Sequence, residues 1–349
     1  QIGAWFGWSV ASAGDVNVDG YSDVIIGAYG YDDGANMNEG RAFVYHGSAT
    51  GLSLIPNSSP DDADQAEAYF GSSVASAGDV NGDGYSDVII GAYRYDDGAN
   101  ANEGRAFLSN GGATGLSATP NSTPDDADQA GAFFGYSVAS AGDVNGDGYS
   151  DVIIGAANYN DNYSFEGVAF IYHGSVTGLS ASPNSSPDDA NQGTAFFGAS
   201  VASAGDVNGD EYSDVIIGAY TFDDGANIDE GRVFVYHGSA SGLSATPNSI
   251  PDDANQPYAY FGWSVAGAGD VNGDGYSDVI IGAPAYTDGA NTGEGRAFVY
   301  YGSASGLSAI ANSTPDDADQ ANVNFGRSVA GIGDVNGDGY SDVIIGAPY

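Results

Sequence analysis

The sequence repeats itself with a period of about 64 residues, and this period constrains the fold more than any other feature. Matching segments begin at Gln1, Gln65, Gln129, Gln192, Gln256 and Gln320, at steps of 64, 64, 63, 64 and 64 residues. Such units stack, because one unit cannot bury both of its apolar faces alone. We therefore interpret residues 1–349 as one domain of repeats 1–64, 65–128, 129–191, 192–255 and 256–319, followed by a partial repeat at 320–349.

The second repeat shows the elements expected in every copy. Its apolar runs have five to nine residues, are rich in Val, Ile, Phe and Tyr, and are bounded by Gly, Asp, Asn and Pro, which is typical of strands and turns. We predict strands over 70–78, 87–92 and 105–111, and a fourth within 116–122. Stacked four-stranded antiparallel sheets predict an all-β fold, a β-propeller with six or seven blades if the ring closes. A linear β-solenoid is the alternative, although its coils are usually shorter, about 20–30 residues.

The composition excludes several classes of partner. The 349 residues include 47 acidic and only six basic residues, all of them Arg, for a formal net charge of −41. Six scattered Arg residues cannot form the basic surface that nucleic acids or anionic membranes require. Cys is absent, and no apolar run approaches the about 18 residues of a membrane helix. The chain begins at Gln1 without a start Met or a signal-like segment, as expected of a processed or excised piece.

A nine-residue acidic loop, D-x-N-x-D-G-x-x-D, follows the first predicted strand of each repeat. Side-chain oxygens at positions 1, 3, 5 and 9 and the carbonyl oxygen at position 7 can surround one hard cation, and Gly at position 6 permits the sharp turn. Oxygen donors without Cys or convergent His favour Ca²⁺ over Zn²⁺, and a large, flexible set of donors favours it over Mg²⁺. The predicted ligands of up to six Ca²⁺ ions are Asp15, Asn17, Asp19, Tyr21, Asp23, Asp79, Asn81, Asp83, Tyr85, Asp87, Asp143, Asn145, Asp147, Tyr149, Asp151, Asp206, Asn208, Asp210, Tyr212, Asp214, Asp270, Asn272, Asp274, Tyr276, Asp278, Asp334, Asn336, Asp338, Tyr340 and Asp342.

Two copies depart from this pattern. Glu211 stands at position 6 of the fourth loop, where a side chain costs about 1 kcal/mol of strain, so we predict the weakest site there. Val18 replaces Gly at position 4 of the first loop, where we expect little change. The alternative to a metal site is a set of Asp-, Asn- and Gly-rich turns without an ion. That alternative leaves three carboxylates to repel one another within nine residues.

Two further motifs accompany the acidic loop. Phe-Gly pairs begin at Phe6, Phe70, Phe134, Phe197, Phe261 and Phe325, and Gly-Ala-Pro occurs at 282–284 and 346–348. The other four copies have Tyr or Ala in place of this Pro. In this combination the repeats resemble the FG-GAP repeat of the integrin α-subunit propeller and its bacterial relatives, over the whole chain. The resemblance implies a propeller, usually of seven blades, that serves as a non-enzymatic adhesion or protein-interaction module.

The antiparallel strands sort their loops onto two ends of each sheet. The Ca²⁺ motif shares one end with the loop from strand three to strand four. The other end carries Asp32, Asp33, Glu39 and their equivalents, and by the resemblance to integrins it is the candidate face for a protein or glycan partner. A solvated acidic surface that keeps the protein soluble is the alternative. Arg41, Arg105, Arg232 and Arg296 follow Glu-Gly at equal phase and are predicted to pair with local carboxylates.

No enzyme is predicted. His46, His173 and His237 occupy one repeat position, and carboxylate pairs recur in most repeats, whereas catalysis needs one asymmetric constellation of groups. Loops that bind Ca²⁺ at millimolar concentration favour an extracellular or cell-surface location. Two other functions stay open: a filament or surface layer whose copies join head to tail through incomplete end blades, and a glycan-binding lectin with pockets between blades.

Overall fold

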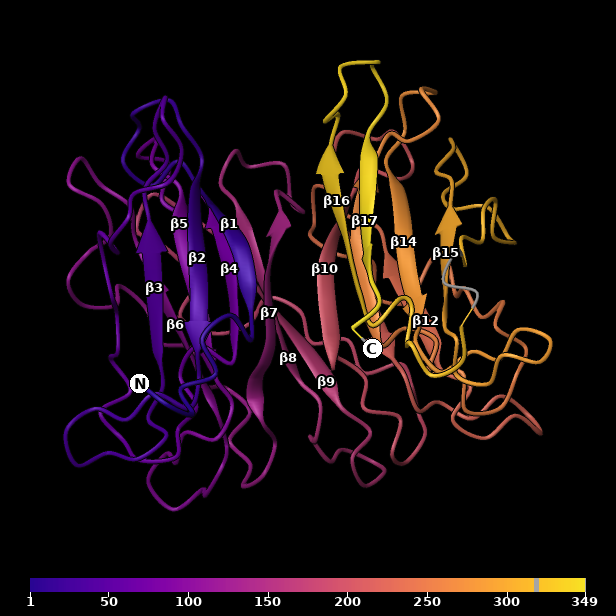
Figure 1. Ribbon diagram of the computed structural model, residues 1–349, viewed down its shortest axis with the longest axis horizontal. Helices are drawn as coiled ribbons and strands as arrows, with labels where there is room; N and C mark the ends of the chain where they lie inside the picture. The colour runs from indigo at the N-terminus through magenta and orange to yellow at the C-terminus, as the bar shows by residue number, and fades with distance from the viewer. Residues whose placement is uncertain (317–319, 349) are drawn as a thin grey trace. The chain divides into compact units, whose positions relative to one another are not determined.

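The computed structural model describes residues 1–316 and 320–348, and every regular element in this part of the chain is a β-strand. The described residues contain no helix of the length and apolarity that a membrane span needs. The presence of strands as the regular elements of the described residues confirms the predicted all-β class. The strands drawn in Figure 1 are β1 (Val10–Gly14), β2 (Asp23–Ala28), β3 (Arg41–Tyr45), β4 (Ser73–Gly78), β5 (Asp87–Ala92), β6 (Arg105–Ser109), β7 (Phe134–Gly142), β8 (Asp151–Ala156), β9 (Val168–Tyr172), β10 (Ser200–Gly205), β11 (Asp214–Ala219), β12 (Arg232–Tyr236), β13 (Ser264–Gly269), β14 (Asp278–Ala283), β15 (Arg296–Tyr300), β16 (Ser328–Gly333) and β17 (Asp342–Gly346).

The strands pair in chain order into small antiparallel sheets. Five sheets have three strands, in the orders β1-β2-β3, β4-β5-β6, β7-β8-β9, β10-β11-β12 and β13-β14-β15, and β16-β17 form a sheet of two. The middle strand is the apolar run DVIIGA, and in β5 all six residues are buried. A strand covered on both faces requires a continuous apolar run instead of alternation, which explains why this segment is the least polar part of each repeat.

The first strand ends in a β-bulge just before the acidic loop in the sheets that begin with β1, β4, β10, β13 and β16. In the second sheet Ser76 pairs with Val88 and Gly78 pairs with Asp87, so the register shifts between these two pairs. A bulge bends the strand and redirects the chain after it. The acidic loop is thereby held at one end of the sheet, and its ninth residue is the first residue of β5.

The predicted fourth strand is wrong as a strand, because the corresponding segment makes only an isolated bridge. In the second repeat the backbone N–H of Leu108 donates to Ser122 at 2.9 Å, and that of Ala106 donates to Pro124 at 3.0 Å. Pro120 and Pro124 flank the bridge. Proline has no N–H to donate and a fixed φ, so the pairing cannot extend in either direction. Three-stranded sheets with a bridged fourth segment are consistent with propeller blades; the number of blades and the closure of a ring stay predictions.

The chain divides into two compact units. The first comprises residues 1–140, 147–159 and 170–186, and the second comprises residues 141–146, 160–169 and 187–349. Within the first unit the β1–β3 and β4–β6 sheets pack together, with the ring of Phe70 fully buried 5.1 Å from that of Phe107. Within the second unit the β10–β12 and β13–β15 sheets pack in the same way, with Phe261 5.1 Å from Phe298. Phe70 and Phe261, each the Phe of a Phe-Gly motif, are thus core residues between neighbouring sheets.

Candidate metal-binding loops and the opposite loop end

The loop between β4 and β5 folds around the carboxylate of Asp79. Asp79 Oδ1 accepts the backbone N–H groups of Gly82 and Asp83 at 2.7 and 3.1 Å, and its Oδ2 accepts that of Gly84 at 2.8 Å. Asp83 Oδ1 accepts the N–H of Tyr85 at 3.0 Å. The same three bonds recur around Asp206, Asp270 and Asp334. The spacing of the motif therefore fixes the loop conformation through its own carboxylates.

The ninth position of the loop is a buried carboxyl group. Asp87 is fully buried; its Oδ2 accepts the N–H of Val80 at 2.9 Å and its Oδ1 that of Gly111 at 2.9 Å. Burial raises the pKa of Asp87 to about 7 despite these two hydrogen bonds, and the nearby Asp83 and Asp79 raise the pKa further. Burial likewise raises the pKa of Asp214 to about 7 and that of Asp278 to about 6. The charges that act on Asp87 are negative, so its ionised form needs a positive charge from elsewhere.

The donors of this loop fit a hard divalent cation in kind and in spacing. Asp79, Asn81, Asp83 and Asp87 offer oxygen donors within nine residues, and a cation supplies the positive charge that buried Asp87 lacks. Among the described residues, however, no three Asp, Glu or His side chains converge on one point, because the loop carboxylates accept backbone N–H groups. A cation would share these oxygens with the backbone through their second lone pairs. The predicted ligand sets of all six loops stay predictions.

Positions 4 and 6 of the loop both require a left-handed backbone. Gly84 at position 6 has φ of 88°, and Glu211 at the same position of the fourth loop has φ of 74°. At position 4 the φ of Gly82 is 71° and that of Val18 is 56°. Left-handed backbone costs an L-residue about 1–2 kcal/mol, and for a β-branched residue it is a conformational outlier. The strain predicted at Glu211 therefore has a structural basis, whereas the expectation of little change at Val18 overlooked a second constrained position.

The loops of neighbouring repeats are tied to one another. The N–H of Ser86 donates to the carbonyl oxygen of Asp15 at 3.1 Å, and the N–H of Asp15 donates to Ser86 Oγ at 3.2 Å. A Cβ added at Gly82 would lie 2.6 Å from the ring of Tyr149, so that ring stands directly over the preceding loop. In the second unit the same backbone bonds join Ser277 to Asp206 and Ser341 to Asp270. Hydrogen bonds therefore connect the acidic loops of successive repeats directly.

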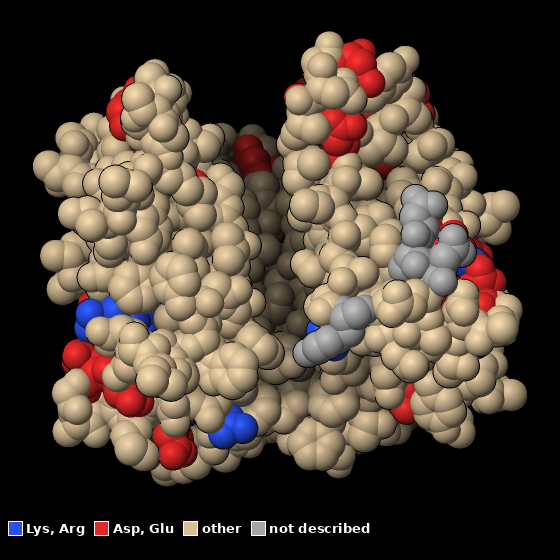
Figure 2. All heavy atoms as spheres, viewed as in Figure 1, with Lys and Arg blue, Asp and Glu red and all other residues tan. Residues whose placement is uncertain are grey.

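At the opposite end of the sheets, arginines of the chain form ion pairs with some of the acidic side chains. Arg232 forms ion pairs with Asp224 at 3.0 Å and with Asp252 at 3.1 Å, and its guanidinium lies 4.2 Å from the ring centre of Phe222. The equivalent pairs are Arg41 with Asp33 and Asp61, Arg105 with Asp97 and Asp125, and Arg296 with Asp288 and Asp316. This confirms the predicted pairing of these arginines. Figure 2 shows basic and acidic atoms side by side at this end of the first unit.

The glutamates of this end do not belong to its exposed surface, which corrects their assignment to the candidate partner face. Glu39, Glu103 and Glu230 are each only 1% exposed. Both carboxylate oxygens of Glu39 and of Glu103 are shielded from water, and burial outweighs the neighbouring Asn36 and Asn100 amides that act to lower their pKa. Burial is the largest cause that raises the pKa of each of the three. The sequence did not indicate that these glutamates are buried. Each of them stands between polar loop residues and the third strand of its repeat, and only the packed structure shows that its side chain faces the interior.

A row of aromatic side chains at this same end was not anticipated. In the first unit the ring of Tyr29 lies 5.1 Å from Trp8 and 5.3 Å from Tyr69, and the ring of Tyr93 lies 5.6 Å from Tyr69 and 5.4 Å from Tyr136. These rings border a pocket of about 320 Å³ that is lined by Trp8, Tyr29, Ser72, Tyr93 and Tyr136. In the sequence, Tyr29 and Tyr93 stand at the same position of their repeats, each directly after the apolar run DVIIGA. This repeated aromatic position could have indicated the row.

Two of the three histidines lie against the acidic loop of their own repeat. His46 Nδ1 is 3.0 Å from Asn17 Nδ2, and His237 Nδ1 is 3.1 Å from Asn208 Nδ2. Each imidazole therefore contacts the amide at position 3 of a loop. This contact supports a structural role for the repeated Tyr-His-Gly segment.

Comparison with known proteins places these motifs in a family context. Integrin alpha-V of Gallus gallus is 34% identical over 229 residues, which are 64% of this chain and 21% of that protein. Integrin alpha-5 of Xenopus laevis is 33% identical over 252 residues, 70% of this chain and 22% of that protein. Integrin alpha pat-2 of Caenorhabditis elegans is 33% identical over 228 residues, 61% of this chain and 18% of that protein. The match therefore spans about a fifth of the length of each relative.

A solved structure, that of rhamnogalacturonan lyase YesW, aligns with 97% of this chain and 74% of its own, at 13% identity and a TM-score of 0.40. This likeness is too weak to bear on function. The model of the FG-GAP repeat, in contrast, matches six times, at residues 6–45, 70–108, 134–172, 197–236, 261–300 and 325–349. These matches include every acidic loop described above. The chain therefore belongs to the FG-GAP repeat family and resembles the integrin α chains.

Proposed function

We propose that this chain is a Ca²⁺-binding, non-enzymatic adhesion or protein-interaction module that works outside the cell or at its surface. The observation that carries the proposal is the loop of oxygen donors that recurs six times in phase, with a buried Asp at position 9 in the second, fourth and fifth copies that lacks a positive partner. The similarity to integrin α chains supports an adhesion role. The millimolar Ca²⁺ of extracellular fluids supports the location.

Different loop residues would have different roles in a Ca²⁺ site. Asp87 connects the loop to β5, Asp79 holds the turn closed, and the bonds between Ser86 and Asp15 join one loop to the next. Bound Ca²⁺ supplies two positive charges to each loop. With a Kd of about 0.1 mM at about 1 mM Ca²⁺, each filled site adds roughly 1.4 kcal/mol to the free energy of unfolding, and six add roughly 8 kcal/mol. Such a contribution rivals the whole stability of an ordinary domain.

Calcium titration tests this part of the proposal. Isothermal titration of the protein stripped with EDTA is expected to give up to six sites, and the variant Asp87→Asn is expected to lose one of them. The matched control is Asp97→Asn, which removes one charge from the opposite end of the same repeat and should leave the number of sites unchanged. A protein that takes up no Ca²⁺ at millimolar concentration refutes the metal assignment.

The proposed partner surface is the loop end that carries the aromatic row. Exposed aromatic side chains around a pocket are typical of the energetically dominant centre of protein interfaces. Trp8 is 57% exposed and Tyr136 is 39% exposed. A protein or glycan ligand of a cell surface that met this end would cover rings that water now contacts.

Cell attachment tests this surface. Plates coated with the chain are expected to retain cells in Ca²⁺ and to release them in EDTA, and Trp8→Ala combined with Tyr93→Ala should reduce retention severalfold. Leu54→Ala, a change at another exposed apolar residue, serves as the control. Equal retention by the aromatic variant and the control would show that the partner binds elsewhere.

A further inference from the structure

The second repeat differs from its neighbours at one position beside its acidic loop. Where the first, third and fourth repeats have Tyr-His-Gly, the second has Ser109, Asn110 and Gly111. Asn is the smaller side chain, so the difference removes volume from a place where the other repeats keep an imidazole.

In the first and fourth repeats, the imidazole ring at this position fills a space under a glycine of the next repeat. A Cβ added at Gly115 would lie 3.1 Å from the ring of His46, and a Cβ added at Gly306 would lie 3.0 Å from the ring of His237. In both cases the His of one repeat lies under a glycine of the next. Gly178 is the equivalent glycine after Asn110, and a Cβ added there would meet nothing within 4 Å. The change from His to Asn therefore opens a space between the second and third repeats.

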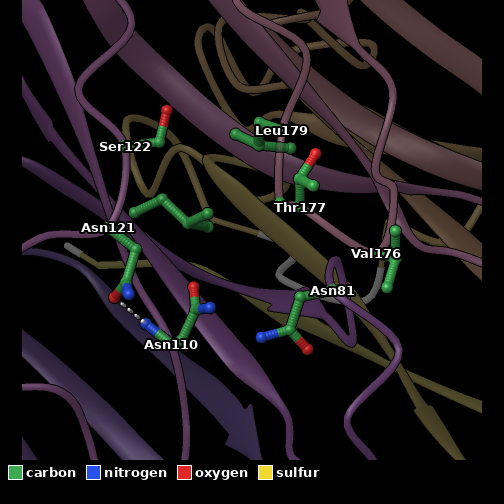
Figure 3. A pocket seen from close by; sticks show the side chains of 9 residues that line it. Asn81, Asn110, Asn121, Ser122, Val176, Thr177 and Leu179 are labelled. Carbon is green, nitrogen blue, oxygen red and sulfur yellow. Dashed lines mark hydrogen bonds between the residues drawn. The ribbon is translucent and has the colours of Figure 1, made fainter.

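This space is a cavity of about 240 Å³ with a neutral, polar lining (Figure 3). The second repeat contributes the amides of Asn81, Asn110 and Asn121 and the hydroxyl of Ser122, and the third repeat contributes the hydroxyl of Thr177. Asn121 Oδ1 already accepts the backbone N–H of Asn110 at 2.9 Å, the bond drawn in Figure 3. The side-chain oxygen of Asn110, in contrast, is buried without a hydrogen-bond partner. A buried acceptor in that state is stabilised by a donor from a bound molecule.

The chemistry of the lining restricts the ligand. None of the described residues that line the cavity is charged, and the acidic loop of Asp79 and Asp83 adjoins it through Asn81, which disfavours anions. Amides and hydroxyls both donate and accept hydrogen bonds, as do the hydroxyl groups of a sugar. Val176 and Leu179 add an apolar wall for the C–H face of such a ring. An apolar cavity of about 150 Å³ can hold a benzene molecule, so a volume of about 240 Å³ has room for a single sugar ring.

We propose that the cavity between Asn110 and Thr177 binds one neutral monosaccharide unit. The equivalent place is filled by His46 in the first repeat and by His237 in the fourth, so the site is not a property of every copy. It is formed by neutral side chains, with amides and hydroxyls as its polar groups. The cavity shares Asn81 with the predicted Ca²⁺ ligands of the second loop, so sugar binding is measured at constant Ca²⁺. The proposal does not involve the adhesive surface at the other end of the sheets.

The test exchanges the distinguishing residue in both directions. Saturation-transfer NMR with free glucose, galactose, mannose, fucose and N-acetylglucosamine, at constant Ca²⁺, is expected to show at least one sugar that binds the wild-type chain with a Kd below about 10 mM. Asn110→His, which restores the residue of three other repeats, should weaken that binding at least about tenfold. His46→Asn should open a second cavity and raise the number of bound sugars from one to two.

Each outcome decides the proposal. Because both variants use residues that the chain already carries at the equivalent position, unchanged melting temperatures are expected to show that folding is preserved. Wild-type protein that binds none of the five sugars overturns the proposal, as does Asn110→His that binds as well as the wild type. Loss of binding in Asn110→His together with gain in His46→Asn supports it.

Discussion

Both loop ends of the sheets are rich in Asp, but among the described residues only one of them pairs its carboxylates with arginines of the chain. At the end opposite the acidic loops, Arg232 neutralises Asp224 and Asp252 within the chain. At the acidic-loop end of the second repeat, the hydrogen-bond donors to the three loop carboxylates are neutral backbone N–H groups and the amide of Asn81. Figure 2 shows the same contrast, with acidic atoms alone on the loop between β16 and β17.

This difference separates two sources of stability. Ion pairs within the chain are present whatever the solution contains, although exposed pairs weaken with salt. Under the proposed Ca²⁺ binding, the loops that lack a positive partner take cations from the solution, and their contribution to stability follows the concentration of those cations. The opposite end should therefore be insensitive to Ca²⁺, and the acidic-loop end should govern how the protein responds to it.

The largest expected effect is that of removing Ca²⁺. If six sites with a Kd of about 0.1 mM are emptied from about 1 mM Ca²⁺, the protein loses roughly 8 kcal/mol, and its melting temperature falls by about 10 °C for a chain of this length. Calorimetry in EDTA and in EDTA with excess Ca²⁺ measures the shift. Melting curves that coincide in the two buffers would contradict the distinction between the two ends.

The second largest expected effect is the loss of stability when the ion pairs of Arg232 are removed. Arg232→Gln removes the partner of Asp224 and Asp252 and is expected to cost about 1–3 kcal/mol, because hydrogen bonds to charged groups are lost from a partly buried site. Denaturant unfolding should give the same cost with Ca²⁺ and with EDTA. A cost that disappears in EDTA would mean that the opposite end also depends on Ca²⁺. Arg94, an arginine outside these ion-paired positions, is the matched site for a control change to Gln.

The periodic features of this architecture could be predicted from the sequence, because period and residue type determine them locally. The run at 87–92 requires a buried middle strand, and Arg105 lies at a fixed phase from Asp97 and Asp125. The acidic loop was likewise recognisable from spacing alone, since each Asp bonds to the backbone a few residues away.

Features that depend on the neighbouring repeat could not be predicted in this way. Val18 is strained at position 4 of its loop, and a ring from the next repeat stands over that position where it is Gly82. The cavity beside Asn110 exists because this side chain, unlike His46 in the first repeat, does not fill the space under the glycine of the next repeat. The single bridge at Ser122 is different, because Pro120 and Pro124 of the same repeat limit the pairing, and a prediction from strand propensity alone did not weigh them. Contacts between repeats recur with the repeat, but the residue types at one position do not specify which residue of the next repeat they meet, so only the structure reveals them.

A smaller, pH-dependent effect should come from the buried glutamates. The pKa of Glu103 is raised on folding, mainly by burial, so the folded chain keeps a proton that the unfolded chain has lost. Stability therefore falls as pH rises from about 4.3 through the raised pKa, by about 1.4 kcal/mol for each unit of difference. Glu103→Gln should remove this slope and raise stability at pH 7, as followed by denaturant unfolding at several pH values. Glu67→Gln, at an exposed Glu, should leave the slope unchanged.

The smallest expected effect is the relief of strain at position 6 of the fourth loop. Glu211 has φ of 74°, and its N–H still donates to Asp206 Oδ2 at 2.8 Å, as glycine does at this position elsewhere. Glu211→Gly removes about 1–2 kcal/mol of left-handed strain, but glycine loses about 0.5–1 kcal/mol more backbone entropy on folding. The net gain is about 0.5–1 kcal/mol in EDTA, with a tighter fourth Ca²⁺ site because the loop is held at less cost. The reverse change, Gly84→Glu, should destabilise the second loop by a similar amount. Unfolding and Ca²⁺ titration of this pair measure both quantities, and a destabilised Glu211→Gly would mean that the Glu side chain itself contributes to the loop.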